Sequence, residues 1–431
     1  MKGCNVNMNL KNLNIFQNGK IEKGNLSIAG SIISDIGPNH SMIESDSDIF
    51  FADSAYAFPG FIDVHVHLRE PGYSYKETIE TGTMAAAHGG YTAVCTMPNL
   101  NPVPDSVENL KVQLDIIEKT ARVAVYPFGS ISKGEKGVEL SDMEELADYV
   151  VGYSDDGICV QSHHLMEEAM KKAKALGKIV AAHCECNSLA DGGYIHDGKY
   201  AKKHGHKGLS SESEYKAIER DIELARKTGA HYHVCHLSCK ESVEIVRRAK
   251  AEGLNVTCEV AAHHVCLDDS MLKEDGIYKV YPPIRSLEDR LAVIEGIVDG
   301  TVDMIASDHA PHTEEEKSKG LKDSAKGIVG LETTFRVLHS KLVRTKLVSL
   351  ERLIDLVYTN PRKIFKVGAP FEKGEEATFT IFDLESEHKV EGKGFFSKTK
   401  FTPFEGMTVY ARCLMTVYKG EIVYLDESLK K

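Results

Sequence analysis

Apolar and polar positions divide the chain into three stretches with different periodicities. Residues 10–57 carry short apolar runs separated by turn signals, of which Asn18-Gly19 is typical of a tight β-hairpin. Residues 58–367 alternate continuous apolar runs with amphipathic segments, and short strand-like runs return after them, with Lys419-Gly420 as a turn. The pattern predicts an α/β domain in the middle, bracketed by strand-rich ends that pair into one small β-domain.

The central stretch is predicted to hold eight strands that alternate with helices. The expected strands end at His67 or cover residues 91–97, 123–128, a short run before 154, 179–183, 231–236, 255–260 and 303–307. The expected helices cover residues 78–88, 107–120, 142–149, 165–176, 212–228, 242–251, 287–298, 331–345 and 349–357. Residues 39–48 are polar and are predicted to be a loop, and residues 187–210 are rich in glycine and histidine with weak periodicity and are predicted to be a surface excursion.

Eight strands alternating with helices over about 300 residues are typical of a parallel (β/α)8 barrel, an α/β fold. The alternative is an open, doubly wound sheet, which usually places a glycine-rich phosphate-binding loop after its first strand. Here His65-Val66-His67 stands at that place, which favours the barrel. We therefore predict a (β/α)8 TIM barrel over residues 58–370, with residues 1–57 and 371–431 forming a small β-sandwich domain.

Composition narrows the classes of partner. The formal net charge is −12, which argues against nucleic acid and anionic membranes as partners but leaves a small anionic substrate possible. Residues 1–12 are polar and lack the apolar core of a signal peptide, and no apolar run approaches a membrane span. The ten cysteines are scattered and read as reduced thiols, so we expect a cytoplasmic protein.

Residue types that bind metals recur where the predicted strands end. His65 and His67 are two positions apart, so strand alternation places both imidazoles on one side. The other strand ends carry Asn99, Asp156, His183, His236 and Asp308. Active-site residues of barrel enzymes lie at the carboxyl ends of the strands. Four histidines with two carboxylates can hold two divalent ions about 3.5–4 Å apart, so two metal ions, with Zn²⁺ expected, are the predicted cofactor.

This arrangement favours hydrolysis of an amide or ester, or the reverse reaction. Two cations lower the pKa of a shared water and polarise a substrate carbonyl. A carboxylate beside that water can take its proton and pass it to a leaving nitrogen. Asp308, at the last strand end, is the predicted catalytic proton shuttle.

The motifs at these strand ends resemble those of a known family. HLREPG, TMPN, SDDG, AHCE, HVCHLS and SDHAPHTEEEK occur in this order, and EATFTIFDL and TPFEG follow near the end of the chain. Together they resemble the amidohydrolase superfamily and, more narrowly, bacterial dihydroorotases whose metal bridge is an aspartate. The resemblance covers nearly the whole chain. It implies a homodimeric enzyme that interconverts N-carbamoyl-L-aspartate and dihydroorotate in pyrimidine synthesis.

The resemblance also implies a role for each site residue. One metal is held by His65, His67 and Asp308, and the other by His183 and His236. The resemblance implies that Asp156 bridges the two metals. Without the resemblance, the sequence leaves Asp155 and Asp156 as alternatives. Three residues resemble the family's grip on the substrate carboxylate: Arg69, Asn99 and His312. The segment 307–319 resembles a mobile loop that closes over ligand.

Three stretches depart from the family's pattern, and no departure touches a metal ligand. Tyr281 stands before Pro282-Pro283 where relatives carry an asparagine that contacts substrate. Ala325-Lys326-Gly327 replaces a common Pro-Phe-Gly that contributes backbone contacts, so Gly327 remains a predicted substrate contact. Phe401 stands where an asparagine is common, which bears on structure more than on chemistry.

Two other functions compete with the dihydroorotase interpretation. Hydantoinases and allantoinases use a carboxylated lysine as metal bridge, and Asp156 weighs against them. A non-catalytic scaffold for a transcarbamoylase would have lost metal ligands, and this chain retains them. Several other acidic and histidine residues stay unassigned or are expected to support the site or the core: Asp63, His231, His233, His263 and His264.

Overall fold

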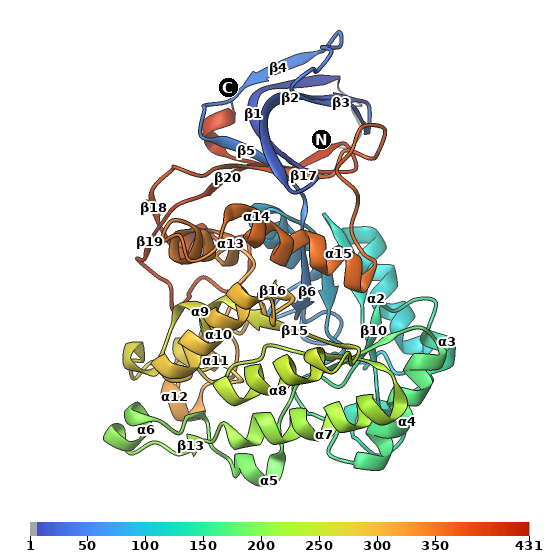
Figure 1. Cartoon of the computed structure of the whole chain (residues 1–431), viewed down its shortest axis with the longest axis vertical. Helices are drawn as coiled ribbons and strands as arrows, with labels where there is room; N and C mark the ends of the chain where they lie inside the picture. The colour runs from blue at the N-terminus through green and yellow to red at the C-terminus, as the bar shows by residue number, and fades with distance from the viewer. Residues whose placement is uncertain (1–6, 431) are drawn as a thin grey trace.

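The structure is a computed structural model that describes residues 7–430. Residues 1–6 and 431, which the predicted β-domain includes, lie outside the described residues. Figure 1 shows a layer of helices and parallel strands that makes up most of the molecule, with a β-sheet part above it to which both ends of the chain contribute. Within residues 7–430, no helix has the length and apolar character needed to cross a membrane.

The parallel strands of the α/β part lie in two sheets. One sheet has the order β6-β7-β8, with strands Phe61–Val66, Tyr91–Thr96 and Ala124–Pro127. The other has the order β16-β15-β14-β11-β10-β9, with strands Met304–Ala306, Val256–Ala261, His231–Val234, Ile179–Ala182, Gly152–Ser154 and Gly129–Ser130. Most of these strand residues are buried, as the continuous apolar runs predict.

Contacts join the edges of these two sheets. Val66, at the end of β6, forms a parallel bridge with His309, just after β16. The amide of Val151 donates to the carbonyl of Pro127 at the end of β8, 2.9 Å away. The carboxyl ends of all these strands therefore point in one direction and lie around one region.

The main helices follow the strands as predicted. They are α1 (Ile79–His88), α2 (Val107–Thr120), α4 (His163–Ala175), α7 (Glu212–Thr228), α8 (Lys240–Ala251) and α10 (Leu287–Asp299). Capping explains the sharp starts, since Thr78, Ser106, Ser162 and Ser286 each accept a backbone N–H at a helix N-terminus. The predicted helices at 331–345 and 349–357 become α13 (Thr334–Leu338) and α14 (Leu350–Ile354), each continued by a π-helical turn.

Two local predictions were wrong, and two regions contain elements that were not predicted. The helix expected at 142–149 is a single turn, α3 (Met143–Leu146), because Asp142 makes no side-chain cap. The surface excursion expected at 187–210 contains α5 (Asn187–Ala190), α6 (Lys199–His204) and the strand pair β12–β13 (Ile195–His196, Gly208–Leu209). Strand β4 (Ser47–Phe50) occupies part of the loop expected at 39–48. Helix α15 (Asn360–Phe365) was not predicted, although Pro361 suits its first turn.

The two ends of the chain meet in one eight-stranded sheet. Its order is β21-β20-β17-β5-β1-β2-β3, and β4 pairs with β1. The N-terminal strands are β1 (Met8–Gln17), β2 (Lys20–Ala29), β3 (Ile32–Gly37) and β5 (Ala55–Pro59), and the C-terminal strands are β17 (Phe379–Asp383), β20 (Arg412–Tyr418) and β21 (Glu421–Leu425). Strands from the two ends of the chain are paired directly, β5 with β17. The hairpin predicted at Asn18-Gly19 is confirmed, with both residues at positive φ.

An aromatic cluster connects this sheet to the α/β part. Phe58 (β5) and Phe382 (β17) come from the eight-stranded sheet, whereas Phe61 (β6) and Phe335 (α13) come from the α/β part. The ring of Phe335 lies 4.6 Å from that of Phe61 and 4.7 Å from that of Phe382. All four are buried, so this cluster joins the two parts by apolar packing.

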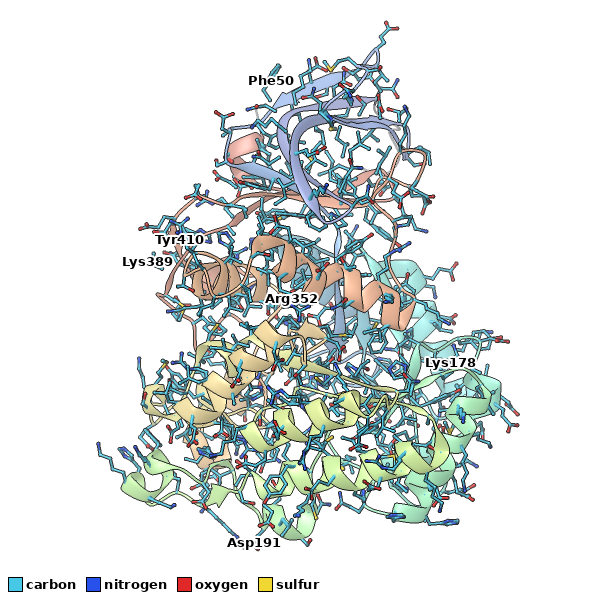
Figure 2. All side chains as sticks on the ribbon, viewed as in Figure 1. Phe50, Lys178, Asp191, Arg352, Lys389 and Tyr410 are labelled. Carbon is cyan, nitrogen blue, oxygen red and sulfur yellow. The ribbon has the colours of Figure 1, made fainter. Side chains whose placement is uncertain are left out.

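The central position of Phe335 gives a stability prediction. Phe335→Ala should lower the free energy of unfolding by about 3–5 kcal/mol, because it opens a cavity among three other rings. Phe50, 72% exposed on β4 (Figure 2), supplies a matched control, and Phe50→Ala should change stability by less than about 0.5 kcal/mol. Equal midpoints for the two variants in urea denaturation would contradict this view of the cluster.

Candidate metal centre and active site

Six buried ionisable side chains meet at the carboxyl ends of the parallel strands. They are the four histidines and two aspartates predicted from the strand ends: His65, His67, Asp156, His183, His236 and Asp308. Each is at most 5% exposed. The structure therefore brings together every residue that the sequence placed in the metal site.

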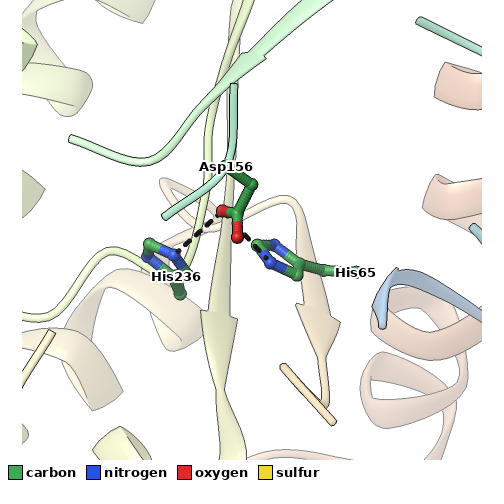
Figure 3. A group of neighbouring side chains, drawn as sticks. All are labelled: His65, Asp156 and His236. Atoms are coloured by element: carbon green, nitrogen blue, oxygen red, sulfur yellow. Dashed lines mark ion pairs between the residues drawn. The ribbon is translucent and has the colours of Figure 1, made fainter. Parts of the chain in front are cut away.

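Asp156 lies at the centre of this group, between His65 and His236 (Figure 3). Its Oδ1 is 3.4 Å from His65 Nε2 and 3.6 Å from His236 Nε2, and its Oδ2 is 3.4 Å from His67 Nε2. A carboxylate in this position lies within reach of metal ions bound by the histidines on either side of it.

Two further contacts complete the cluster. Asp308 Oδ1 lies 3.3 Å from His67 Nε2 and 3.6 Å from His65 Nε2. His183 Nδ1 lies 3.0 Å from His236 Nε2. Two sets of three, His65 with His67 and Asp308, and His65 with Asp156 and His236, each present ligand atoms within 4.8 Å of one another.

The histidine and aspartate side chains of this cluster are better suited to binding metal ions than to hydrogen bonding with one another. His65 Nε2, Asp156 Oδ1 and His236 Nδ1 are buried and have no hydrogen-bond partner. Buried polar atoms are nearly always satisfied, and those left over call for a specific explanation. Imidazole nitrogens and carboxylate oxygens converging on one space are ligands for zinc-like divalent ions.

The electrostatics place His183, Asp156 and Asp308 in the protonation states that bind metals, whereas neighbouring carboxylates raise the pKa values of His65 and His236 against the effect of burial. Burial, and then the charge of His236, lower the pKa of His183 to about 3, so its imidazole is neutral. Burial raises the pKa of Asp308, but the hydrogen bond from His67 and the nearby histidine charges lower it below its usual range. The same opposition lowers the pKa of Asp156, through His65 above all.

The backbone is strained at two of these residues, His236 and Asp308, and at the neighbouring Arg69. Arg69, His236 and Asp308 have φ values of 60°, 32° and 46°, in the left-handed region that non-glycine residues avoid. Such strain persists where the surrounding structure enforces it, typically at functional sites. It turns each side chain toward the common centre.

Glu259, on β15, was not identified from the sequence. Its Oε1 is 2.6 Å from His65 Nδ1, and its Oε2 is 3.1 Å from His233 Nε2. The carboxylate thus fixes the ring of His65 with Nε2 facing the centre. The signal that could have identified it is a single acid within the otherwise uncharged run Asn255–Val260 (NVTCEV), because buried carboxylates need a partner.

The structure also separates the two candidate aspartates. Asp155 Oδ1 accepts the amide N–H groups of Ile131 (2.7 Å) and Ser132 (3.0 Å), so it fixes a loop and faces away from the centre. Asp63 similarly accepts N–H groups from His65 and Ser307. His264 hydrogen-bonds to the carbonyl of Pro282 through Nε2, and like His263 it does not line the pocket.

A cavity of about 170 Å³ opens beside the cluster and contains all the predicted substrate-binding residues. Arg69 Nε donates to the carbonyl of Pro311 (3.2 Å), and its Nη2 lies 3.3 Å from His312 Nε2. Asn99 Oδ1 is 2.9 Å from His67 Nδ1, which leaves the Asn99 amide N–H groups free for a ligand. This wall presents a guanidinium, an amide and an imidazole to one space.

The same cavity is also lined by two of the stretches that depart from the family's pattern. The Nζ of Lys326 lies 3.4 Å from the centre of the Tyr281 ring, and the hydroxyl of Tyr281 donates to the carbonyl of Gly193. The amide of Gly327 donates to the carbonyl of Lys279, 3.0 Å away. The two departures therefore form one contact.

Comparison with known proteins agrees with the motifs. The family model described as "Dihydro-orotase-like" matches residues 56–242. A dihydroorotase of Fusobacterium nucleatum is 48% identical over 97% of this chain and 99% of its own. A dihydroorotase of a Geobacillus species is 46% identical over 96% of this chain and 98% of its own.

Solved structures show the same fold at lower identity. An L-hydantoinase (dihydropyrimidinase) from Arthrobacter aurescens superposes with a TM-score of 0.87 at 23% identity, over 97% of this chain and 96% of that one. A dihydropyrimidinase from Brevibacillus agri gives a TM-score of 0.84 at 22% identity, over 98% of this chain and 95% of that one. With near-full-length relatives at 46–48% identity, the chain belongs to the dihydroorotase family of amidohydrolases.

Proposed function

We propose that this chain is a dihydroorotase that interconverts N-carbamoyl-L-aspartate and (S)-dihydroorotate in the synthesis of pyrimidines. The observation that carries the proposal is one pocket in which Arg69 lies beside six converging metal-ligand residues. An enzyme for this reaction must activate an amide carbonyl and hold a carboxylate at a fixed distance from it. The pocket supplies a group for each task.

The proposed cofactor is a pair of divalent ions, Zn²⁺ in the first instance. His65, His67 and Asp308 would hold one ion, His183 and His236 the other, and Asp156 would bridge them. When bound, such a pair supplies hydroxide near neutral pH and polarises the ring carbonyl. The unpartnered atoms of His65, Asp156 and His236 support this assignment.

Asp308 is the proposed proton shuttle. Its pKa lies below the usual range, so the carboxylate is ionised at neutral pH and can accept the proton of the attacking water. In hydrolysis it then delivers that proton to the ring nitrogen as the C–N bond breaks. In cyclisation, Asp308 removes a proton from the carbamoyl nitrogen as the same bond forms, and it passes that proton to the carboxyl oxygen, which leaves as water as its C–O bond breaks.

Arg69, Asn99 and His312 are the proposed grip on the substrate carboxylate. A guanidinium binds a carboxylate through two parallel hydrogen bonds. Burial, and then the charge of Arg69, lower the pKa of His312 to about 3, so His312 contributes a neutral imidazole and Arg69 supplies the charge. Tyr281 and Gly327, which line the same cavity, are proposed as further substrate contacts.

The two competing functions fit less well. The hydantoinase structures are below 25% identical to this chain and share its fold, while the bridging position here holds Asp156. Arg69 faces the pocket, where an unsubstituted hydantoin has no carboxylate to bind. A scaffold without activity has no need of six intact ligands, and all six converge here.

We extend the proposal to the architecture and the setting of the protein. The two parallel sheets are interpreted as arcs of one (β/α)8 barrel over residues 58–370, supported by the Val66–His309 bridge. Residues 1–57 and 371–431 are assigned to the β-sandwich domain. We also expect a homodimer in the cytoplasm. The nine cysteines within the described residues are free thiols, as a reducing compartment requires.

Substrate choice and metal dependence are testable together. The protein should turn over dihydroorotate, lose that activity with a chelator and regain it with Zn²⁺, while hydantoin and allantoin should react at least about 100-fold more slowly because they lack a carboxylate for Arg69. Turnover would be followed by absorbance or chromatography. Chelator-resistant turnover, or a preference for hydantoin, would remove the proposal.

Replacement of Asp308 tests the proton shuttle. Asp308→Asn should lower kcat by about 10²–10⁴-fold in both directions, because the amide cannot carry the proton. Metal content is measured in parallel, since Asp308 is also a proposed ligand. Asp323→Asn, on the exposed loop helix α12 (Gly320–Asp323), is the control and should behave as the parent protein. A metal-loaded Asp308→Asn variant with near-parental kcat would exclude Asp308 as the shuttle.

Replacement of Glu259 tests the support behind His65. Glu259→Gln should weaken metal binding by about 10–100-fold, because His65 loses the carboxylate that orients its ring. Competition with a fluorescent chelator measures the affinity without relying on activity. The exposed Glu288, at the start of α10, gives the control Glu288→Gln. Equal metal affinity in both variants would show that the 2.6 Å contact to His65 does not position the ligand.

A further inference from the structure

Lys326 and Tyr281 form part of the wall of the pocket that the metal-ligand residues also line. Tyr281 lies between the short helix η3 (Gly276–Tyr278) and α10, and Lys326 follows α12. The Lys326 Nζ sits 3.4 Å from the ring centre of Tyr281, within the range of a strong cation–π contact. Both residues line the same cavity as Arg69.

The Lys326 ammonium has charge available for a ligand. Within residues 7–430, no carboxylate oxygen lies within 4.0 Å of its Nζ. By contrast, Lys76, the other lysine near His312, is paired with Glu316 at 2.9 Å. An ammonium has three N–H donors, and stacking on one aromatic face leaves donors free to point into the pocket.

Lys326 is also adjacent to the proposed carboxylate grip. Its backbone carbonyl accepts a hydrogen bond from His312 Nε2 at 2.8 Å. Arg69 Nη2 lies 3.3 Å from the same nitrogen. The Lys326 backbone and the Arg69 guanidinium therefore contact the same nitrogen of His312, and the Lys326 side chain starts beside the residues proposed to bind the carboxylate.

A buried lysine holds this wall in place. Lys317 is 3% exposed, and its Nζ donates to the carbonyls of Lys279 (2.8 Å), Ala325 (3.0 Å) and Gly327 (2.8 Å). These carbonyls lie on the two segments that carry Tyr281 and Lys326. The ammonium of Lys317 thus joins the two segments, which holds Lys326 and Tyr281 in position relative to each other.

We propose that Lys326, held against the Tyr281 ring, is a further substrate-binding residue that shares with Arg69 the recognition of the non-reacting carboxylate. This inference rests on the proposed function, because it concerns the substrate of that site. Lys317 is a positioning residue for it. The chain would then replace the contacts of its relatives at these positions with a cation supported by an aromatic ring.

The test is steady-state kinetics on the metal-loaded, full-length protein with dihydroorotate. Lys326→Met, which keeps the length and removes the charge, should raise KM by about three- to tenfold and change kcat by less than about twofold, as expected for a partly exposed charge contact. Lys322→Met removes the same charge from α12, outside the pocket, and should leave KM unchanged. Lys326→Arg, which keeps the charge, should recover most of the affinity.

A double-mutant cycle tests the contact with the ring. Tyr281→Leu should raise KM to a similar extent, and adding Lys326→Met to it should cost less than the product of the two single effects, because both remove one interaction. Equal KM values for Lys326→Met, Lys322→Met and the parent protein would overturn the inference. Fully multiplicative effects of Tyr281→Leu and Lys326→Met would overturn the role of the ring.

The parent protein separates this inference from the proposed function. If the parent protein does not turn over dihydroorotate, the proposed function fails, and the inference that rests on it fails as well. If the parent is active and Lys326→Met matches it, only the role of Lys326 fails. Binding of orotate, a planar carboxylate that does not react, gives a second readout by calorimetry, with the same order of affinities expected.

Discussion

The carboxylate of Asp156 is the constraint on which the rest of the site depends. It is buried and ionised, with histidine nitrogens 3.4–3.6 Å away on three sides. A charge in that position is tolerable only if cations face it, and the surrounding histidines cannot all be protonated in so small a volume. In the proposed account, bound divalent ions would resolve the conflict, since they would compensate both aspartates and use neutral imidazoles as ligands. The parallel strands deliver these groups to one point because their carboxyl ends all lie on the same side.

The sequence could place these six residues together because the signal for each one is local. Each proposed ligand lies at or just after the end of a buried strand, so the alternation of apolar runs and helices was enough to place His183 and Asp308 at the same end of the fold. The choice between Asp155 and Asp156 was different. Both follow the same short strand, and only the backbone of Ile131 and Ser132, which binds Asp155, shows which one faces the centre. Contacts between segments far apart in sequence decide such cases.

The same reason explains what the sequence did not predict. Glu259 supports His65 from a strand 194 residues away, and no spacing rule connects the two. Tyr281 and Lys326 each looked like an isolated departure from the family's pattern, whereas the fold brings them into one contact. In the fold, the strands and long helices followed their periodicity, but the single turn of α3 and the short elements between 187 and 210 did not. Such short pieces depend on tertiary packing more than on their own propensity.

The central claim is that six strand-end residues hold two metal ions with Asp156 between them. A crystal structure of the Zn²⁺-loaded protein, with anomalous scattering data collected at the zinc edge, tests it most directly. The account predicts two anomalous peaks, one among His65, His67 and Asp308 and the other beside His183 and His236, with Asp156 in contact with both. A single peak, or peaks that leave Asp156 without a metal contact, would contradict it.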